Sequence, residues 1–154
     1  MTRRGWNNVL IFSTLIMIFL FNGLHHKLFS SEADVEVILP PNQHLYSIDF
    51  PGVSVQKMSD GQWQMMTAQD IYWSSKRIEQ LVHQWQQLKA EILTDPPTFK
   101  GYPEATVSFW FSNQQKAFVA RLYQQQGHLY LTNGKNVYML PESQNLEALL
   151  PLLQ

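Results

Sequence analysis

The sequence contains no cysteine, which excludes disulfide bonds, thiolate metal sites and a cysteine nucleophile. Charged residues make up only 15% of the 154 residues, and the formal net charge is −1. A strongly basic nucleic-acid-binding protein would carry a large excess of lysine and arginine. The seven glycines form no phosphate-binding pattern, so a nucleotide-binding enzyme is not expected either.

Hydrophobic residues, in contrast, are plentiful at 45% of the chain, and 13% of the residues are aromatic. This hydrophobic content is higher than that of disordered chains, which cannot bury enough apolar surface to fold. The length suits one domain of ordinary size. We therefore expect a single folded domain whose core forms without disulfide bonds.

An uncharged, mostly apolar segment runs from Val9 to Leu24. Extended to Trp6 and Phe29, it is long enough to cross about 30 Å of hydrocarbon as a helix. Its valine, leucine, isoleucine and phenylalanine residues together favour insertion by roughly 3–7 kcal/mol. We expect residues 1–29 to form a cytoplasmic tip and a transmembrane anchor, with the lipid bilayer as the partner of Val9 to Leu24.

The charges on either side of this segment predict its orientation. Arg3 and Arg4 precede it, whereas Lys27 and then several acidic residues follow it. The excess of positive charge before the segment predicts an N-terminus in the cytoplasm, an anchor in the inner membrane and a periplasmic C-terminal domain. A cleaved signal peptide is the alternative, with residues 31–33 as the nearest small-x-small site.

The remainder of the chain divides into a tether and a folded domain. Residues 30–43 are small and acidic at first and contain Pro40 and Pro41 near their end, which is typical of a tether. In the predicted domain, residues 44–154, three strand-like runs at 45–50, 53–58 and 62–66 are separated by Pro51-Gly52 and Asp60-Gly61. These turn signals predict an antiparallel meander.

A helix is predicted next, because apolar residues recur at intervals of three or four on one face: Ile78, Leu81, Val82, Trp85, Leu88 and Ile92. Ser74 or Ser75 can cap its N-terminus, and the prolines after Asp95 end it. Strands are then expected at 105–112, 118–123, 128–132 and 137–140, and a short helix in the leucine-rich residues 143–153. The predicted fold class is α+β, an antiparallel sheet packed by one main amphipathic helix and a short C-terminal helix.

The sequence offers little chemistry for catalysis. The five histidines are not spaced as a metal site, and no serine lies in a nucleophile motif. A pair of carboxylates for a hydrolase would have to come from acids whose separation the sequence does not give. We predict no catalytic, cofactor-binding or metal-binding residue, no cofactor, and that the protein is not an enzyme.

Two aromatic residues are the candidate partner contacts. Trp110 alternates with Phe109 and Phe111, so it lies on the opposite strand face, among small polar residues. An exposed tryptophan on a sheet is a candidate contact for a partner, a glycan or a membrane surface. Tyr130 is the second candidate. The alternative for Trp110 is that the C-terminal leucine-rich segment covers it.

Several features of the sequence, taken together, resemble those of a known domain. They are the anchor, the strand pair 48–50 and 53–55, the Asp60-Gly61-x-Trp63 turn, the amphipathic helix and the hairpin ending at 137–140. Over about residues 45–150 the chain resembles an uncharacterised extracytoplasmic domain. That domain is found in membrane-anchored auxiliary proteins of gliding-motility-type ABC transporters and in short single-pass bacterial proteins. The resemblance implies one α+β module at the outer face of an inner membrane, and no catalytic residue.

The sequence thus predicts a single-pass inner-membrane protein with a non-catalytic periplasmic domain. We expect this domain to bind another envelope protein of unknown identity, and not a nucleic acid. The alternative is a periplasmic domain that binds a small ligand, a glycan or a lipid. A hydrolase that uses a carboxylate pair is the third hypothesis.

Overall fold

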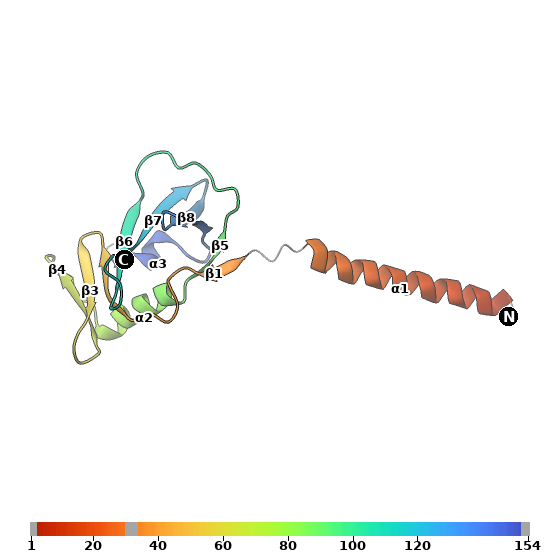
Figure 1. Cartoon of the computed structure of the whole chain (residues 1–154), viewed down its shortest axis with the longest axis horizontal. Helices are drawn as coiled ribbons and strands as arrows, with labels where there is room; N and C mark the ends of the chain where they lie inside the picture. The colour runs from red at the N-terminus through yellow and green to blue at the C-terminus, as the bar shows by residue number, and fades with distance from the viewer. Residues whose placement is uncertain (1–2, 30–33, 152–154) are drawn as a thin grey trace. The chain divides into compact units, whose positions relative to one another are not determined.

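The chain forms two separate units, comprising Met1–Ala33 and Asp34–Gln154. The computed structural model describes the backbone of residues 3–29 and 34–151, and the side chains of residues 5–21 and 34–151. In the described part of the first unit the chain forms one helix, α1 (Arg3–Phe29), drawn in red and orange in Figure 1. The candidate cleavage site at residues 31–33 lies outside the described residues.

Helix α1 covers the segment that was expected to cross a membrane. Within the part of the chain that the structure describes, however, no helix is both long enough and apolar enough to span a bilayer.

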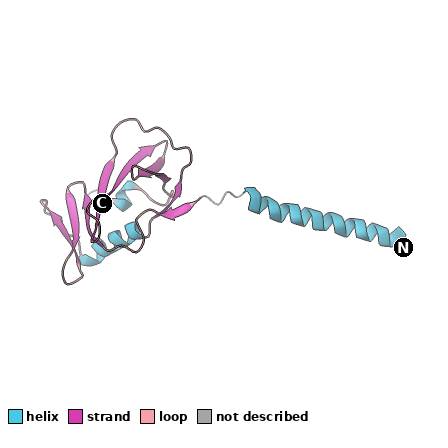
Figure 2. Cartoon of the chain, in the orientation of Figure 1, coloured by secondary structure: helices cyan, strands magenta, loops and turns pink. Residues whose placement is uncertain are grey.

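The second unit is built on one antiparallel sheet of nine strands (Figure 2). The strands lie in the order β1-β5-β9-β8-β7-β6-β2-β3-β4. Their bounds are β1 (Val35–Val37), β2 (Leu45–Phe50), β3 (Val53–Lys57), β4 (Trp63–Thr67), β5 (Lys89–Ile92), β6 (Ala105–Phe111), β7 (Phe118–Gln125), β8 (His128–Thr132) and β9 (Val137–Met139). The predicted α+β class and the antiparallel sheet are therefore confirmed.

The predicted meander is present as β2, β3 and β4. Strand β2 pairs with β3 so that Phe50 lies opposite Val53, and Gly52 between them has a φ of 78°. A residue without a Cβ adopts this left-handed conformation at little cost, which explains the tight connection. Within residues 34–151, strand β4 pairs only with β3, so it is one edge of the sheet.

The main helix, α2 (Ser75–Gln86), is shorter than predicted. Its N-terminus is capped by Ser74, as expected, and its buried face consists of Ile78, Leu81, Val82 and Trp85. The prediction that Leu88 and Ile92 continue this face is wrong. The helix ends at Gln86, and β5 follows, because Lys89–Ile92 finds hydrogen-bonding partners in β1 on one side and β9 on the other.

The segment expected to be a tether contributes to the folded domain. Val35–Val37 forms the edge strand β1, and the next two residues, Ile38 and Leu39, are each only 4% exposed. The backbone N–H of Ile38 also donates to the Leu88 carbonyl at 3.1 Å. The structure therefore moves the start of the domain from residue 44 to Asp34.

The second half of the sheet follows the prediction more closely. Strands β6 to β9 occupy the expected positions, and two residues, Gln126 and Gly127, connect β7 to β8. The C-terminal helix is shorter than predicted: α3 (Leu146–Leu149) begins after the capping residue Asn145. Residues 152 and 153 of the predicted helix lie outside the described residues.

The two faces of the sheet are covered by different elements. On one face, Trp85 of α2 is fully buried and contacts the rings of Phe50 and Phe109. On the other face, the connection between β5 and β6 passes over the sheet and stacks Phe99 on Tyr123, with ring centroids 4.3 Å apart. The core therefore lies between the sheet and α2, and a long loop covers part of the opposite face.

Candidate functional site

Trp110 lies on the sheet face opposite α2, as its alternation with the buried Phe109 and Phe111 predicts. Its side chain is half-buried, and the indole Nε1–H donates a hydrogen bond to Asp49 Oδ2 at 2.7 Å. The other carboxylate oxygen of Asp49 accepts the hydroxyl of Ser54 at 2.6 Å. Trp110, Asp49 and Ser54 therefore link the neighbouring strands β6, β2 and β3 across their outer face.

This arrangement gives Trp110 a structural role. A hydrogen bond to a charged acceptor contributes about 1.5–3 kcal/mol when it is shielded from water. The hydrogen bond to Asp49 explains the position of the Trp110 indole N–H by itself. Neither contact with a partner nor cover from the C-terminal leucine-rich segment is needed. Both carboxylate oxygens of Asp49 therefore already have hydrogen-bonding partners within the sheet.

Tyr130 is buried rather than exposed. It lies opposite Tyr123 in the sheet, and the ring of Phe99 packs over both of these tyrosines. Trp110 and Tyr130 are also far apart. Tyr123 follows Leu122, which pairs with Ala105 of β6. Trp110 lies five positions further along β6 than Ala105, which is about 17 Å along a strand. The structure therefore does not bring the two candidates together.

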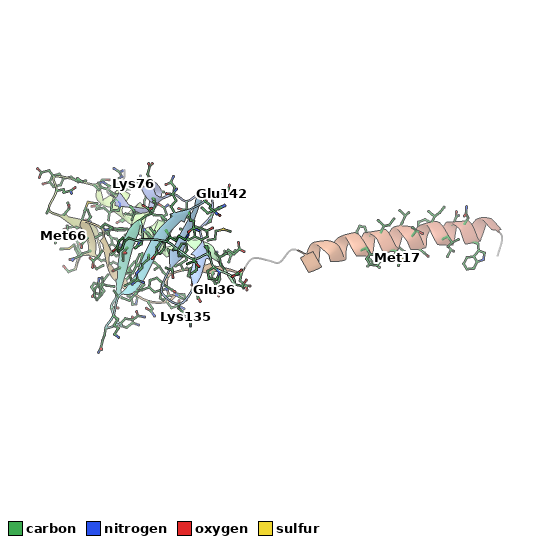
Figure 3. The ribbon with its side chains drawn as sticks, turned by 90° about the horizontal axis from the view of Figure 1, so that it is seen from above. Met17, Glu36, Met66, Lys76, Lys135 and Glu142 are labelled. Atoms are coloured by element: carbon green, nitrogen blue, oxygen red, sulfur yellow. The ribbon has the colours of Figure 1, made fainter. Side chains whose placement is uncertain are left out.

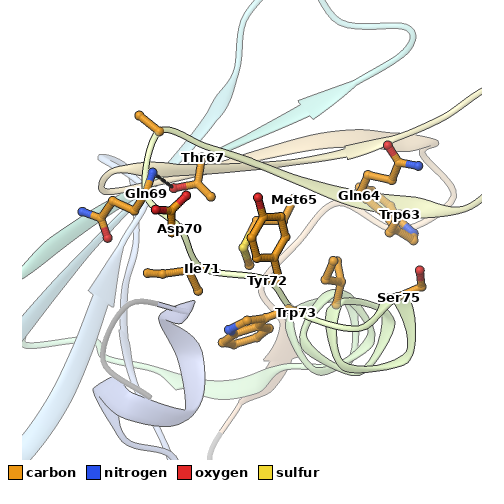
Figure 4. Close-up of a pocket in the computed structure, with 12 residues that line it drawn as sticks. Trp63, Gln64, Met65, Thr67, Gln69, Asp70, Ile71, Tyr72, Trp73 and Ser75 are labelled. Atoms are coloured by element: carbon orange, nitrogen blue, oxygen red, sulfur yellow. Dashed lines mark hydrogen bonds between the residues drawn. The ribbon is translucent and has the colours of Figure 1, made fainter.

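A different site lies beside the edge strand β4. A groove of about 290 Å³ is bounded by β4, by the segment that connects β4 to α2, and by the first turns of α2 (Figure 4). The lining residues are Trp63, Gln64, Met65, Thr67, Ala68, Gln69, Asp70, Ile71, Tyr72, Trp73, Ser75 and Ile78. Six of these twelve residues are large aromatic, aliphatic or methionine residues, the exposed surface of the groove is mostly polar, and Tyr72 is 91% exposed.

The groove follows the free edge of β4. Successive side chains of a strand point to opposite faces of the sheet, so Gln64 and Met65 lie on different faces. Both line the groove, which places the groove alongside the strand rather than above one face. Among the described residues, the backbone of β4 forms ladder hydrogen bonds only with β3, so its outer edge remains unpaired.

On the side of the groove away from β4, the ring of Trp73 lies next to the charged side chain of Arg77. Trp73 packs against the hydrophobic core, and the guanidinium carbon of Arg77 lies 3.8 Å from the centroid of its ring. Such a cation–π contact holds the indole in place and contributes about 0.5–1 kcal/mol at an exposed site. Lys76 precedes Arg77, and the first turn of α2 contains no acidic residue.

The two edges of the sheet are protected to different degrees. Natural proteins block exposed edges with charged residues, proline or very short strands. Strand β1 follows this rule, because it has three residues with Glu36 at its centre. Strand β4 has five residues, Trp63–Thr67, and none of them is charged or a proline. The edge of β4 is therefore open to pairing with another strand.

Other hollows on the domain are also open surface grooves. One of about 280 Å³ lies between the β7–β8 turn and α3, and one of about 270 Å³ adjoins β1 and β9. Glu91 and Glu142 both line the latter. Throughout residues 34–151, no three histidine, aspartate or glutamate side chains gather into a group that could hold a metal ion.

No protein-family model, curated protein or solved structure matches the chain. The resemblance to the transporter-associated extracytoplasmic domain therefore stays a prediction. The groove beside β4 was not predicted from the sequence. The signal that could have indicated it is the uncharged run from Trp63 to Thr67, although the sequence does not say that this strand lies at an edge.

Proposed function

We propose that the protein is a membrane-anchored, non-catalytic binding domain that recognises another protein of the cell envelope. In this proposal α1 holds the chain in the inner membrane with its N-terminus in the cytoplasm. The sheet domain then works in the periplasm, where the groove beside β4 receives the partner. The absence of a charge or proline along the unpaired edge of β4 is the observation that carries the proposal.

The surface of α1 supports the membrane anchor. Seven consecutive apolar residues from Leu15 to Phe21 cover almost two turns, so every side of this part of the helix is apolar. All seven are more than half exposed, and Figure 3 shows the side chain of Met17 projecting from the helix. A helix that is hydrophobic on all sides needs an apolar environment. A bilayer accommodates a short apolar helix by local thinning and through flanking side chains that reach the interface.

The shape of the domain favours a protein partner over a small ligand. Small-molecule sites bury most of the ligand in a concave and largely apolar cavity. The hollows described above are open grooves, and the buried side chains between α2 and the sheet form one continuous core. An open groove beside a strand suits recognition of a polypeptide, whose backbone can pair with the edge. Binding of a glycan or a lipid is the second candidate.

Site-specific photo-crosslinking in intact cells tests the proposal. A photoreactive amino acid replaces Gln64, which lines the groove with an exposed side chain, in the full-length protein. The control carries the same amino acid at Lys135, which Figure 3 places on the other side of the domain from Lys76. We expect a reproducible adduct with one envelope protein at position 64 and none at position 135. Equal labelling at both positions, or none at position 64, would contradict the proposal.

The topology is tested separately, by adding a protease to spheroplasts of cells that contain the full-length chain. In the proposed orientation the sheet domain is accessible from outside and is degraded, while a tag before Arg3 is protected. Protection of the sheet domain, or recovery of the full-length chain in the soluble fraction, would show that the anchor is incorrectly assigned. Neither result depends on what the groove binds.

A further inference from the structure

The side chains of strand β1 contribute little to the core of the domain. The strand lies beside β5 at one edge of the sheet (Figure 1), and all three of its side chains are exposed. Val35 is 56% exposed and Val37 is 39% exposed. Each of the other eight strands within residues 34–151 contains at least one buried side chain. Hydrophobic burial therefore holds β1 in place less than it holds any of these strands.

The packed core begins directly after β1. Ile38 and Leu39 are each only 4% exposed, and both belong to the cluster of buried side chains. The chain thus changes from exposed to fully packed between Val37 and Ile38. Local opening of a protein involves segments with few buried contacts and stops where packing is dense. An opening that begins at Asp34 should therefore end before Ile38.

The backbone hydrogen bonds of β5 alternate between its two neighbours. The Ile92 N–H donates to the Asp34 carbonyl at 3.1 Å, on the side of β1. The next N–H along the chain, that of Leu93, donates to the Val137 carbonyl at 2.9 Å, on the side of β9. Because the bonded positions alternate along a strand, the Ala90 N–H also faces β1. Loss of β1 would therefore free the amides of Ala90 and Ile92 but not that of Leu93.

The edge that β1 covers is protected against pairing with another chain. Lys89 and Glu91 give β5 two charged side chains in four residues. Charged residues on an exposed edge oppose the addition of a further strand. Strand β4 contains no charged residue, so the two edges differ in this respect. Departure of β1 would not leave a second open edge of the kind that β4 presents.

We propose that β1 is a releasable strap, which detaches from β5 as a unit while Ile38 and the rest of the domain stay folded. Release adds the four residues 34–37 to the connection between α1 and the folded domain. Extended chain spans at most about 3.6 Å per residue, so the reach of the domain increases by up to roughly 14 Å. The strap thereby sets how far the groove beside β4 extends from the anchor. This role rests on the proposed function, whereas the detachment of β1 does not.

Amide hydrogen exchange of the unchanged full-length protein in detergent micelles, followed residue by residue by nuclear magnetic resonance, tests the detachment. After correction for intrinsic exchange rates, we expect the amides of Ala90 and Ile92 to exchange at similar rates. Both should exchange at least about tenfold faster than the amide of Leu93, because only these two lose their acceptors when β1 leaves. Equal rates for Ile92 and Leu93 would overturn the strap. Much faster exchange of Ile92 than of Ala90 would show fraying from Asp34 in place of release as a unit, and would overturn it as well.

A disulfide that closes the strap provides the second test. Asp34 and Ile38 both bond to β5, so Val35 and Glu91 face each other at a position without ladder hydrogen bonds. The Cα atoms of such a pair lie about 4.5 Å apart, a distance that a disulfide can bridge. The sequence contains no cysteine that would compete for either thiol. In the oxidised double variant Val35→Cys with Glu91→Cys, exchange of Ile92 should slow by at least about tenfold, and reduction should restore it. Unchanged exchange of Ile92 in the oxidised form would overturn the proposal.

A disulfide between β8 and β9 is the matched control. The Asn133 N–H donates to the Asn136 carbonyl, so the next pair along the ladder, Thr132 and Val137, is also a position without hydrogen bonds. Thr132→Cys with Val137→Cys should leave the exchange of Ile92 unchanged in both redox states. Equal slowing by the two disulfides would mean that exchange of Ile92 follows the stability of the whole domain, which would overturn a separate strap.

The role of the added length is tested in cells with the photoreactive amino acid at position 64. We expect the oxidised disulfide between positions 35 and 91 to lower the yield of the adduct by at least about twofold, because a connection that is too short does not span two sites. Treatment with a reductant should restore the yield, and the control disulfide should have no effect. Equal yields in both redox states would overturn this role. Exchange as expected without an adduct in either state would mean that the strap is present and the proposed envelope partner is wrong.

Discussion

The indole Nε1–H of Trp85 donates a hydrogen bond to the main-chain carbonyl of Leu149, 3.0 Å away. Both residues are fully buried, and they lie 64 positions apart in the sequence. The bond joins α2 to α3 at the centre of the core, where Trp85 also contacts the ring of Phe109 at a centroid distance of 5.0 Å. The C-terminal segment is thus held by a polar contact as well as by its leucines.

Replacing Trp85 tests how much this contact contributes. Trp85→Phe removes ring volume from the core and leaves the Leu149 carbonyl without its donor, so we expect the free energy of unfolding to fall by about 2–4 kcal/mol. Denaturant unfolding of the full-length chain, followed by near-ultraviolet circular dichroism, measures the change. Tyr102→Phe is the control, because Tyr102 is 97% exposed and should have almost no effect. A loss below about 1 kcal/mol for Trp85→Phe would show that the core adapts to the smaller ring.

The hydrogen bond between Trp110 and Asp49 can be measured with a double-mutant cycle. Trp110→Phe removes the donor and Asp49→Ala removes the acceptor, and each change should lower the free energy of unfolding by about 1–3 kcal/mol. Because the two side chains are in direct contact, the double variant should lose about 0.5–3 kcal/mol less than the sum of the single losses. Strictly additive losses would contradict the structural role of Trp110.

The same variant separates Trp110 from the groove beside β4. Trp110 is not among the residues that line the groove, so Trp110→Phe should leave crosslinking from position 64 unchanged. Loss of the crosslink in a variant that is still folded would mean that Trp110 contacts the partner, as the sequence alone suggested.

Local patterns in the sequence were sufficient for much of the sheet. The turn residues Pro51 and Gly52 and the alternation around Phe109 each depend on neighbours in the chain, and both elements were predicted correctly. The end of α2 was not predicted correctly, because Leu88 and Ile92 fit both the periodicity of a helix and that of a strand. They continue a helical face at intervals of four, and with Ala90 between them they also alternate with polar residues as a strand does.

The remaining errors concern contacts between distant segments. Strand β1 forms only because β5 is available to pair with it. At least 51 residues separate the paired positions, as between Val37 and Lys89. No local pattern in the sequence connects residues this far apart. The candidate site was missed for a similar reason. The run from Trp63 to Thr67 is short, and its position at an edge depends on the order of strands in the completed sheet.

Phe99 should hold the connection between β5 and β6 against the outer face of the sheet. Phe99→Ala removes the ring that stacks on Tyr123 at 4.3 Å and packs on Tyr130 at 5.5 Å. We expect a loss of about 1–2 kcal/mol in the free energy of unfolding, since an aromatic pair contributes about 0.5–1.5 kcal/mol beyond its buried area. Limited proteolysis should also cleave residues 93–104 faster than in the unchanged protein. Tyr102 lies in the same loop, and the control variant Tyr102→Ala should alter neither the free energy of unfolding nor the rate of cleavage. Similar cleavage of the two variants would mean that Phe99 does not hold the loop.

The turn between β7 and β8 should respond in opposite directions to two substitutions. Gln126 and Gly127 both have positive φ, at 52° and 77°, between the paired residues Gln125 and His128. This is the backbone of a two-residue hairpin turn that favours Asn-Gly.

Gln126→Asn should therefore stabilise the protein by about 0.5 kcal/mol, because asparagine adopts the left-handed conformation more readily than glutamine. Gly127→Ala should destabilise it by about 1–2 kcal/mol. No atom lies within 4 Å of the added Cβ at position 127, so the expected cost comes from the backbone alone. Thermal unfolding of the two variants checks both signs, and a stabilising Gly127→Ala would show that the turn has a different backbone conformation.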